Sequence, residues 1–256
     1  MVLYYPVTPY IREVRARSIL SRSGIEGIRY TVNPYIGCSH GCVYCYATFM
    51  KKYTGHTEAW GDFVDAKLNA PELLAKQLAR APRGNVILSS VTDPYQAAEN
   101  RYALTRGCLT ALSNHDFPVA ILTKSPLVLR DIDIIERLGD IEVGLTITTD
   151  DDHIRKIFEP KASPIMERLH ALQHLHRHKI RTYAFIGPTL PMSPRKLAEL
   201  LGPCVDRVMI DRMNYPSKTA ALYRRHRLDQ WLDPAYVNHV IEEVRAALDG
   251  LPIEIC

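Results

Sequence analysis

The chain has 256 residues, of which 46% are hydrophobic, and a formal net charge of +4. The length suits one large domain or two small ones, and the apolar content suffices for a sizeable core. The small charge identifies no class of partner, and no apolar run approaches the roughly 18 residues that span a bilayer. Six cysteines without a regular framework argue against a secreted disulfide scaffold. The start, Met1 to Pro6, lacks the features of a signal peptide, so we expect a cytoplasmic protein without a membrane partner.

The expected elements alternate between strands and helices along most of the chain. Residues 1–29 are expected to be an irregular lead-in, residues 30–36 a strand, residues 46–53 the start of a helix, and residues 54–69 a loop. Further strands are expected at 85–89, 117–123, 141–148, 180–186, 207–211 and 252–255. Further helices are expected at 71–79, 102–113, 127–138, 164–177, 193–201 and 234–248.

This alternation predicts an α/β fold with a parallel sheet covered by outer helices, because the strands are continuous apolar runs. Six of the expected strands form the core, starting with residues 30–36 and ending with 207–211. A doubly wound open sheet and a partial barrel give much the same pattern. We expect one domain over 1–256, with a basic lead-in (1–29), a core (30–212) and a C-terminal extension (213–256).

A cysteine-rich stretch from Gly37 to Ala47 follows the first core strand and places Cys38, Cys42 and Cys45 in a CxxxCxxC pattern. Three thiolates on one loop can hold one soft metal centre, and a 4Fe–4S cluster normally takes four cysteine ligands. The next cysteine is Cys108, so three-cysteine ligation would leave one iron open to a small molecule. The alternative is a structural zinc site, with His40 as the fourth ligand.

Polar residues follow three successive core strands. Thr92 lies in the segment after residues 85–89, Lys124 comes directly after 117–123, and Thr146 lies near the end of 141–148. Serine, threonine and aspartate also favour turns and helix caps, which is the simpler explanation for each cluster alone. Because strand ends of a parallel barrel meet at one face, three clusters together favour a ligand site there.

These motifs resemble the radical S-adenosylmethionine (SAM) superfamily, and within it the branch that is similar to spore photoproduct lyase. The resemblance rests on the cysteine spacing, with Tyr44 before the last cysteine, on TDPYQ and the following LTR, on TKS, and on ITT leading to EP. It extends from about Tyr30 to Pro191. It implies a partial (βα)6 TIM-type barrel, a 4Fe–4S cluster, and SAM bound at the open iron. Reduction of the cluster then cleaves SAM and releases a 5′-deoxyadenosyl radical.

The resemblance also implies residue roles. Cys38, Cys42 and Cys45 would ligate the cluster, and Tyr44 would lie against the adenine of SAM. Three residues fall where contacts to SAM occur in the family: Thr92, Lys124 and Thr146. The family further implies a low-potential electron donor such as flavodoxin or ferredoxin.

One position departs from the lyase pattern. The lyase has a cysteine two residues before the hydroxyl that matches Thr92, and that thiol donates a hydrogen atom to the repaired thymine; here the position is Ser90. An O–H bond is stronger than an S–H bond, so serine is a poor hydrogen donor to a carbon radical. Cys108 and Cys204 are expected to be buried hydrophobes but are alternative donors.

Three functions therefore compete. The first is a radical SAM enzyme acting on a nucleic-acid lesion or modified base, which is also favoured by basic, tyrosine-containing segments at 1–30 and 206–230. The second is a radical SAM enzyme acting on a peptide or small metabolite. The third is a non-catalytic iron–sulfur or zinc-binding protein. The sequence leaves the oligomeric state open.

Overall fold

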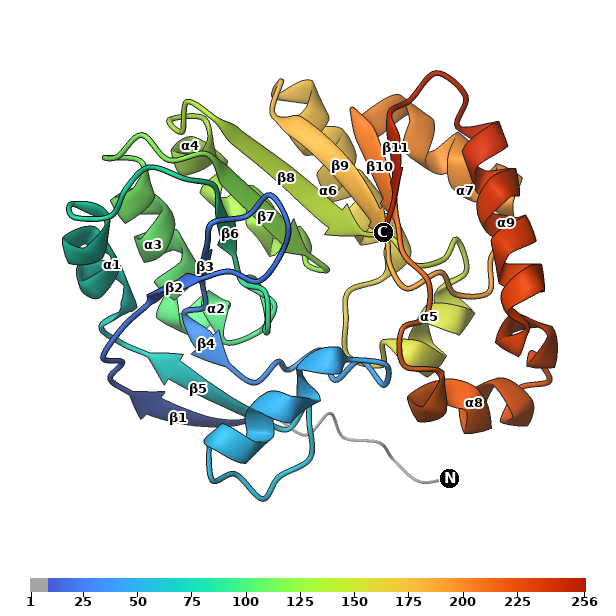
Figure 1. Cartoon of the computed structure of the whole chain (residues 1–256), viewed down its shortest axis with the longest axis horizontal. Coiled ribbons are helices and arrows are strands. Elements are labelled where there is room, and N and C mark those ends of the chain that lie inside the picture. Colours follow the sequence, from blue (N-terminus) through green and yellow to red (C-terminus); the bar gives the residue numbers. More distant parts are fainter. Residues whose placement is uncertain (1–8) are drawn as a thin grey trace.

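The computed structural model describes residues 9–256 and builds them around an eight-stranded sheet with the order β11-β10-β9-β8-β7-β6-β3-β2 (Figure 1). The six central strands are mutually parallel and adjacent in chain order, as expected from the alternation. They are β3 (Tyr30–Val32), β6 (Val86–Leu88), β7 (Val119–Thr123), β8 (Ile141–Thr146), β9 (Arg181–Ile186) and β10 (Arg207–Ile210).

Two further strands form the edges of this sheet. β11 (Ile253–Ile255) runs parallel to β10, and β2 (Leu20–Arg22) runs antiparallel to β3. Within residues 9–256 the two edge strands do not pair with each other, so the sheet is not closed. The fold is therefore the expected α/β class, a partial barrel of parallel strands with outer helices.

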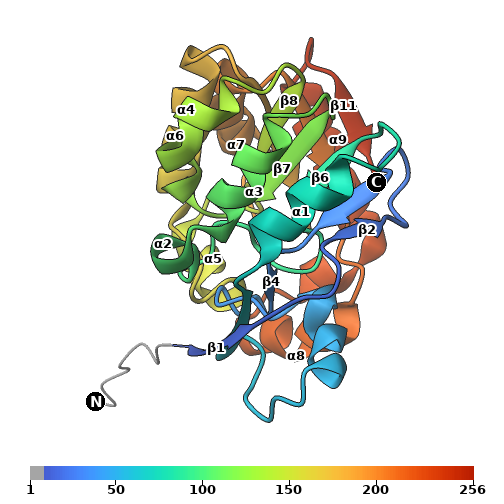
Figure 2. The same cartoon turned by 90° about the vertical axis from the view of Figure 1, so that its left-hand side faces the viewer.

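Helices cover the outer face of the sheet, and the strands between them are buried (Figure 2). None of the helices within residues 9–256 has the length and apolarity needed to cross a bilayer. The expected helix at 102–113 begins only at Leu104, because Ala103 adopts a left-handed conformation with φ 50° that separates it from a short preceding helix. The helices are α1 (Ala70–Leu78), α2 (Glu99–Tyr102), α3 (Leu104–Leu112), α4 (Ile132–Ile135), α5 (Asp152–Phe158), α6 (Ile165–Arg177), α7 (Pro194–Leu201), α8 (Pro216–Arg225) and α9 (Pro234–Ala247), with 3-10 helices η1 (Tyr46–Tyr53), η2 (Pro126–Asp131), η3 (Gly202–Cys204) and η4 (Asp229–Leu232).

A second, three-stranded sheet corrects two expectations. β1 (Tyr10–Val14) pairs in parallel with β5 (Phe63–Lys67), which pairs with β4 (Tyr35–Ile36). The expectations of an irregular lead-in at 1–29 and of a loop at 54–69 were therefore wrong, because each segment contains a strand. Residues 1–8 of the lead-in lie outside the described part of the chain. Each strand is short and its partner is distant in the chain, so the local pattern does not reveal the pairing.

The expected strand at 30–36 is also divided. β3 belongs to the large sheet and β4 to the small one, with Asn33 and Pro34 between them. The cysteine-rich stretch follows β4 directly. This division therefore places the cysteines where the two sheets meet, beside the carboxyl ends of the parallel strands (Figure 1).

Candidate functional site

The three cysteines lie on one loop between β4 and η1. Cys38 and Cys42 are buried, each 8% exposed, whereas Cys45 is half-buried. Two glycines allow the loop its tight course, because Gly37 and Gly41 have φ of +84° and +60°. A Cβ at Gly37 would also lie 2.5 Å from the carbonyl oxygen of Phe63. The loop conformation therefore requires glycine next to the first cysteine.

Burial keeps these thiols protonated. It raises the pKa of Cys38 well above its usual value, with further contributions from Asp93 and the other two cysteines. Burial likewise raises the pKa of Cys42 to about 12, against the opposing charge of Lys124, and raises that of Cys45. A neighbouring cysteine contributes to the rise in pKa at Cys38 and at Cys42. Among residues 9–256, no three His, Cys, Asp or Glu side chains are gathered tightly enough to hold a single metal ion.

The first end of the loop is anchored to the segment that follows β6. The hydroxyl of Thr92 donates to the Gly37 carbonyl at 2.5 Å, and the amide nitrogen of Gln96 donates to the same oxygen at 3.1 Å. The side-chain oxygen of Gln96, which is fully buried, accepts from the backbone N–H of Ser39 at 2.8 Å. Thr92 was expected to contact SAM; in the structure its hydroxyl holds the cysteine loop.

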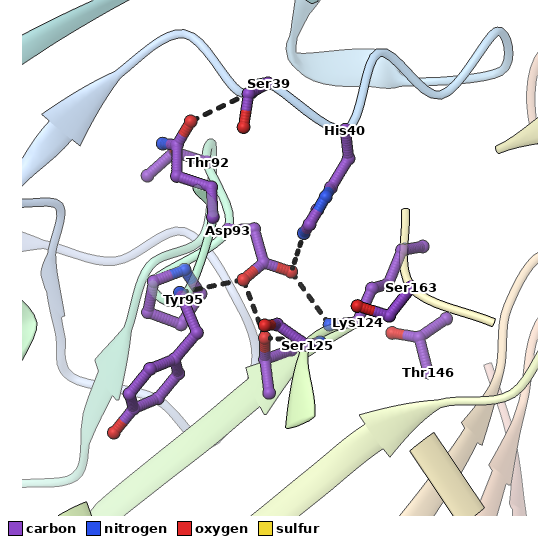
Figure 3. A network of polar contacts seen from close by, with 12 residues as sticks. Ser39, His40, Thr92, Asp93, Tyr95, Lys124, Ser125, Thr146 and Ser163 are labelled. Atoms are coloured by element: carbon purple, nitrogen blue, oxygen red, sulfur yellow. Dashed lines mark hydrogen bonds and ion pairs between the residues drawn. The ribbon is translucent and has the colours of Figure 1, made fainter. Parts of the chain in front are cut away.

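Asp93 joins this segment to the next strand end (Figure 3). Its carboxylate accepts from the Thr123 hydroxyl at 2.6 Å and from the Lys124 and Tyr95 backbone N–H groups, each at 2.8 Å. Burial opposes its charge, but His40, whose Nε2 lies 3.2 Å away, and these hydrogen bonds lower the pKa of Asp93 to about 2. The carboxylate therefore stays ionised and holds the ends of β6 and β7 together.

Tyr44 is fixed by a buried ion pair. Its hydroxyl donates to Glu159, and Arg168 contacts the other oxygen of that carboxylate at 2.5 Å; both Glu159 and Arg168 are 0% exposed. Burial opposes the charge of Glu159, but Arg168 and Lys124 hold its pKa below the usual value. A second nitrogen of Arg168 donates to the Thr146 carbonyl at 2.9 Å, which ties the pair to the end of β8.

Lys124 faces the same carboxylate, whereas Thr146 is linked to it only through Arg168; the threonine hydroxyl that donates to Glu159 is that of Thr148, at 3.1 Å. The Lys124 ammonium lies 4.0 Å from Glu159 and 5.8 Å from the centre of the Tyr44 ring, and donates no hydrogen bond within residues 9–256. Burial disfavours its charge, but Cys42 and Glu159 hold the pKa of Lys124 above its usual value. Two of the four residues expected at a SAM site, Tyr44 and Lys124, therefore lie at Glu159. Thr146 is connected to it through Arg168, and Thr92 precedes Asp93, which binds the Lys124 backbone.

The buried indole N–H of Trp60 has no hydrogen-bond partner within residues 9–256. It is close enough to Cys45 to oppose the rise in the pKa of that thiol. His40 Nε2, in contrast, lies 3.2 Å from the Asp93 carboxylate (Figure 3). Hydrogen bonds to cluster sulfurs tune iron–sulfur centres, so an unpaired indole donor beside Cys45 fits such a group.

Ser90 lies half-buried after β6, in contact with Asn33 and Tyr46. Its backbone N–H donates to the Asn33 side chain at 3.0 Å, and its carbonyl accepts from the Tyr46 hydroxyl. Cys108 and Cys204 are buried as expected. Cys204 precedes β10 and therefore lies at the opposite end of the sheet from the strand ends that carry the polar residues.

Some arginines of the basic segments at 1–30 and 206–230 form ion pairs within the fold, and others are exposed. Arg12 contacts Asp65 at 2.7 Å and Arg207 contacts Glu142 at 2.7 Å, so both hold the fold. Three arginines at the end of α8 are exposed and form no ion pair within residues 9–256: Arg224, Arg225 and Arg227.

The sequence reasoning missed several residues of this site. Asp93 and Gln96 lie in the TDPYQ motif, and Glu159 lies in the EP motif. Their membership of these motifs was a signal that could have identified them as site residues. Arg168 lies on a helix whose pattern gave no signal that a cation faces inward.

Comparison with known proteins is consistent with this geometry. The family model described as "Radical SAM superfamily" matches residues 32–201. An uncharacterised protein of Methanocaldococcus jannaschii is 38% identical over 181 residues, covering 71% of this chain and 68% of that protein. An uncharacterised protein of Mycobacterium tuberculosis is 34% identical over 204 residues, covering 74% of this chain and 60% of that protein.

Solved structures show the same fold at low sequence identity. Spore photoproduct lyase complexed with dinucleoside spore photoproduct has a TM-score of 0.69 at 14% identity, covering 96% of this chain and 81% of that chain. Streptococcus suis SuiB bound to S-adenosylmethionine has a TM-score of 0.56 at 13% identity, covering 98% of this chain and 51% of that chain.

Proposed function

The chain belongs to the radical SAM superfamily of enzymes, and from that premise we propose that it reductively cleaves SAM at a 4Fe–4S cluster and acts on a nucleic-acid lesion or modified base. The observation that carries the proposal is that one loop, with the three cysteines and Tyr44, meets Lys124 and Thr146 at the adjacent strand ends. This places ligands for a cluster beside polar groups for SAM.

We assign the cluster to Cys38, Cys42 and Cys45. The unpaired indole N–H of Trp60 beside Cys45 supports the assignment, because a sulfur of a bound cluster would supply an acceptor for it. Burial favours the protonated thiols in the metal-free protein, so cluster binding must release protons. When bound, the reduced cluster supplies the electron that breaks a carbon–sulfur bond of SAM and generates the 5′-deoxyadenosyl radical.

We assign the binding of SAM to Lys124, Thr146, Tyr44 and Thr92. The Lys124 ammonium lies 4.0 Å from Glu159 and donates no hydrogen bond within residues 9–256, so its N–H groups are available to a carboxylate. Glu159 and Arg168 fix the ring of Tyr44, so a flat adenine would meet a preformed face. The Thr92 hydroxyl already donates to Gly37, so its contribution would come through the position of the loop.

The cofactor assignment is tested by anaerobic reconstitution with iron and sulfide, then reduction in the presence of SAM. We expect about four irons per chain, from the stoichiometry of the cluster, and formation of 5′-deoxyadenosine. A protein that takes up one zinc and no iron would instead indicate the structural metal site that His40 could complete.

Nucleic acid is the substrate class that the surface favours. Arg224 and Arg225 end α8, the helix that contacts the end of the cysteine loop, and Arg227 follows it directly. Exposed arginines without carboxylate partners suit phosphates. The structurally similar lyase is solved with a dinucleoside lesion. A peptide or small metabolite remains the second candidate, because Ser90 stands where the lyase has its hydrogen-donating thiol.

A triple variant, Arg224→Gln, Arg225→Gln and Arg227→Gln, tests the nucleic-acid surface. We expect weaker retention of single-stranded oligonucleotides and a shallower dependence of affinity on salt, because phosphate contacts release counterions. The matched control removes three exposed arginines at or just after the ends of α1, α4 and α6 (Arg80, Arg137 and Arg177) and should leave binding unchanged. Equal binding by both triple variants and the wild type would favour the small-molecule alternative.

Dinucleoside spore photoproduct tests the substrate more narrowly. We expect the wild type to cleave SAM without repairing this lesion, because the Ser90 hydroxyl is a poor hydrogen donor and Cys204 lies at the far end of the sheet. Some repair by Ser90→Cys would indicate a related enzyme adapted to another substrate. Clean multiple-turnover repair by the wild type would contradict the role given to this position.

A further inference from the structure

Lys218 joins α8 to the end of the cysteine loop. Its ammonium donates to the carbonyl oxygen of Cys45 at 2.6 Å and to the hydroxyl of Thr48 at 2.9 Å. These residues are 173 and 170 positions away in the chain. Lys218 also lies outside the residues 32–201 that match the family model, so the contact comes from a part of the chain that the family match does not include.

A second contact holds α8 in this position. Tyr223, on the same helix, is 1% exposed and packs against Phe158 with ring centres 4.8 Å apart. The carbonyl oxygen of Phe158 accepts from the backbone N–H of Val43, inside the cysteine loop, at 3.0 Å. The helix therefore contacts the loop through a buried aromatic pair as well as through Lys218, and the lysine is not a free surface side chain that reaches the loop by chance.

Lys218 binds the Cys45 end of the loop, which is more exposed to solvent than the Cys38 end. Cys45 is half-buried whereas Cys38 and Cys42 are buried, and η1, which follows, carries exposed Tyr46, Phe49 and Tyr53. Figures 1 and 2 both show α8 beside this 3-10 helix, drawn in light blue, at the open side of the molecule. The charge of Lys218 is exposed to solvent, and it lies next to a proposed cluster ligand because the ammonium binds the Cys45 carbonyl directly.

We propose that Lys218 is a positioning residue for the cluster: it fixes the Cys45 end of the loop and places one positive charge beside it, which raises the reduction potential of the bound cluster. The proposal rests on the cluster assignment above. The potentials of iron–sulfur centres depend on net charge, hydrogen bonding and solvent exposure. A nearby cation favours the reduced cluster, because reduction adds negative charge.

The test compares Lys218→Met and Lys218→Arg with Lys52→Met. Lys52 is an exposed lysine of η1 whose ammonium lies 4.8 Å from the centre of the Tyr53 ring, so its removal controls for loss of a nearby charge. Hydrogen exchange of the metal-free proteins reports the positioning. We expect the amides of residues 45–53 to exchange several-fold faster in Lys218→Met, and at the wild-type rate in Lys52→Met, because local opening follows the loss of an anchor.

The midpoint potential of the reconstituted cluster separates the charge effect from simple tethering. We expect Lys218→Met to shift it to more negative values, Lys218→Arg to restore it, and Lys52→Met to leave it near the wild-type value. Unchanged exchange and an unchanged potential in Lys218→Met would overturn the proposal while leaving the cluster assignment intact. Faster exchange without a shift in potential would overturn the electrostatic part. A wild type that takes up no cluster would overturn the cluster assignment and this inference together.

Discussion

The two ends of the cysteine loop are held in different ways. At the first end, Cys38 and Ser39 are buried, and Gln96 and Thr92 bind the backbone through neutral hydrogen bonds of 2.5–3.1 Å from within the barrel. At the second end, Cys45 is half-buried, and the charged side chain of Lys218 binds it from the C-terminal segment. Tyr44 near the middle of the loop is fixed by the buried pair Glu159 and Arg168.

This difference suggests a division of tasks. A buried anchor made of neutral groups depends on complete hydrogen bonding, because each unpaired buried group is destabilising. An anchor at the surface contributes less to stability, since water replaces a lost partner. It can, however, change the charge beside Cys45 and the exposure of that residue to solvent. The barrel therefore sets the shape of the loop, and the C-terminal helix modifies its exposed end.

Loss of any single cysteine should have the largest effect, and here the two ends should not differ. We expect Cys38→Ala, Cys42→Ala and Cys45→Ala each to reduce SAM cleavage to background, because three ligands leave none to spare. The assay is 5′-deoxyadenosine formation after anaerobic reconstitution. Cys256→Ala, which removes an exposed cysteine, is the control and should retain activity. Wild-type turnover in any of the three loop variants would remove that cysteine from the site.

Breaking the ion pair under Tyr44 should give the largest loss of stability. In Glu159→Gln the Arg168 charge stays buried without its partner, which typically costs about 3–5 kcal/mol. Urea unfolding of the metal-free protein measures this. The control is Glu142→Gln, whose pair with Arg207 has both side chains 29% exposed; it should cost less than about 1 kcal/mol. Similar losses of unfolding free energy in the two variants would show that the buried pair contributes no more to stability than the exposed pair.

Lys124→Ala should weaken SAM binding without comparable loss of the cluster. Removing a hydrogen bond from a charged group costs about 1–3 kcal/mol in binding free energy. Calorimetric titration of the reconstituted protein with SAM measures the change. Lys76→Ala, at an exposed position of α1, is the control. If SAM binds both variants as it binds the wild type, Lys124 is not a SAM ligand.

Thr92→Val should have the smallest effect and sharpens the contrast between the two ends. It removes the hydrogen bond that the hydroxyl donates to Gly37 and the one that it accepts from Gln96, at nearly constant volume. Because Gln96 keeps its own bond to Gly37, we expect a cost of about 0.5–1.5 kcal/mol in unfolding free energy. Thr110→Val removes an exposed hydroxyl that donates to the Arg106 carbonyl on α3 and should cost less. Loss of SAM affinity without loss of stability in Thr92→Val would instead make the hydroxyl a direct SAM contact.

Local sequence determined the large sheet. The strands β6 to β10 are continuous apolar runs separated by helices, and a parallel sheet with outer helices is the arrangement that buries such strands on both faces. The cysteine spacing and the polar strand ends were likewise visible, because each is a short motif within a few residues. The structure confirms the six parallel core strands, and it brings Lys124 and Thr146 together beside Tyr44.

Tertiary structure alone decided the contacts between distant segments. The pairing of β1 with β5, the inward-facing Arg168 and the contact of Lys218 with Cys45 have no local signal, since each depends on a partner far along the chain. A short strand, a helix arginine and a surface lysine are common in any sequence. Their roles here follow from burial and from which group they meet, and those are properties of the folded chain rather than of its local pattern.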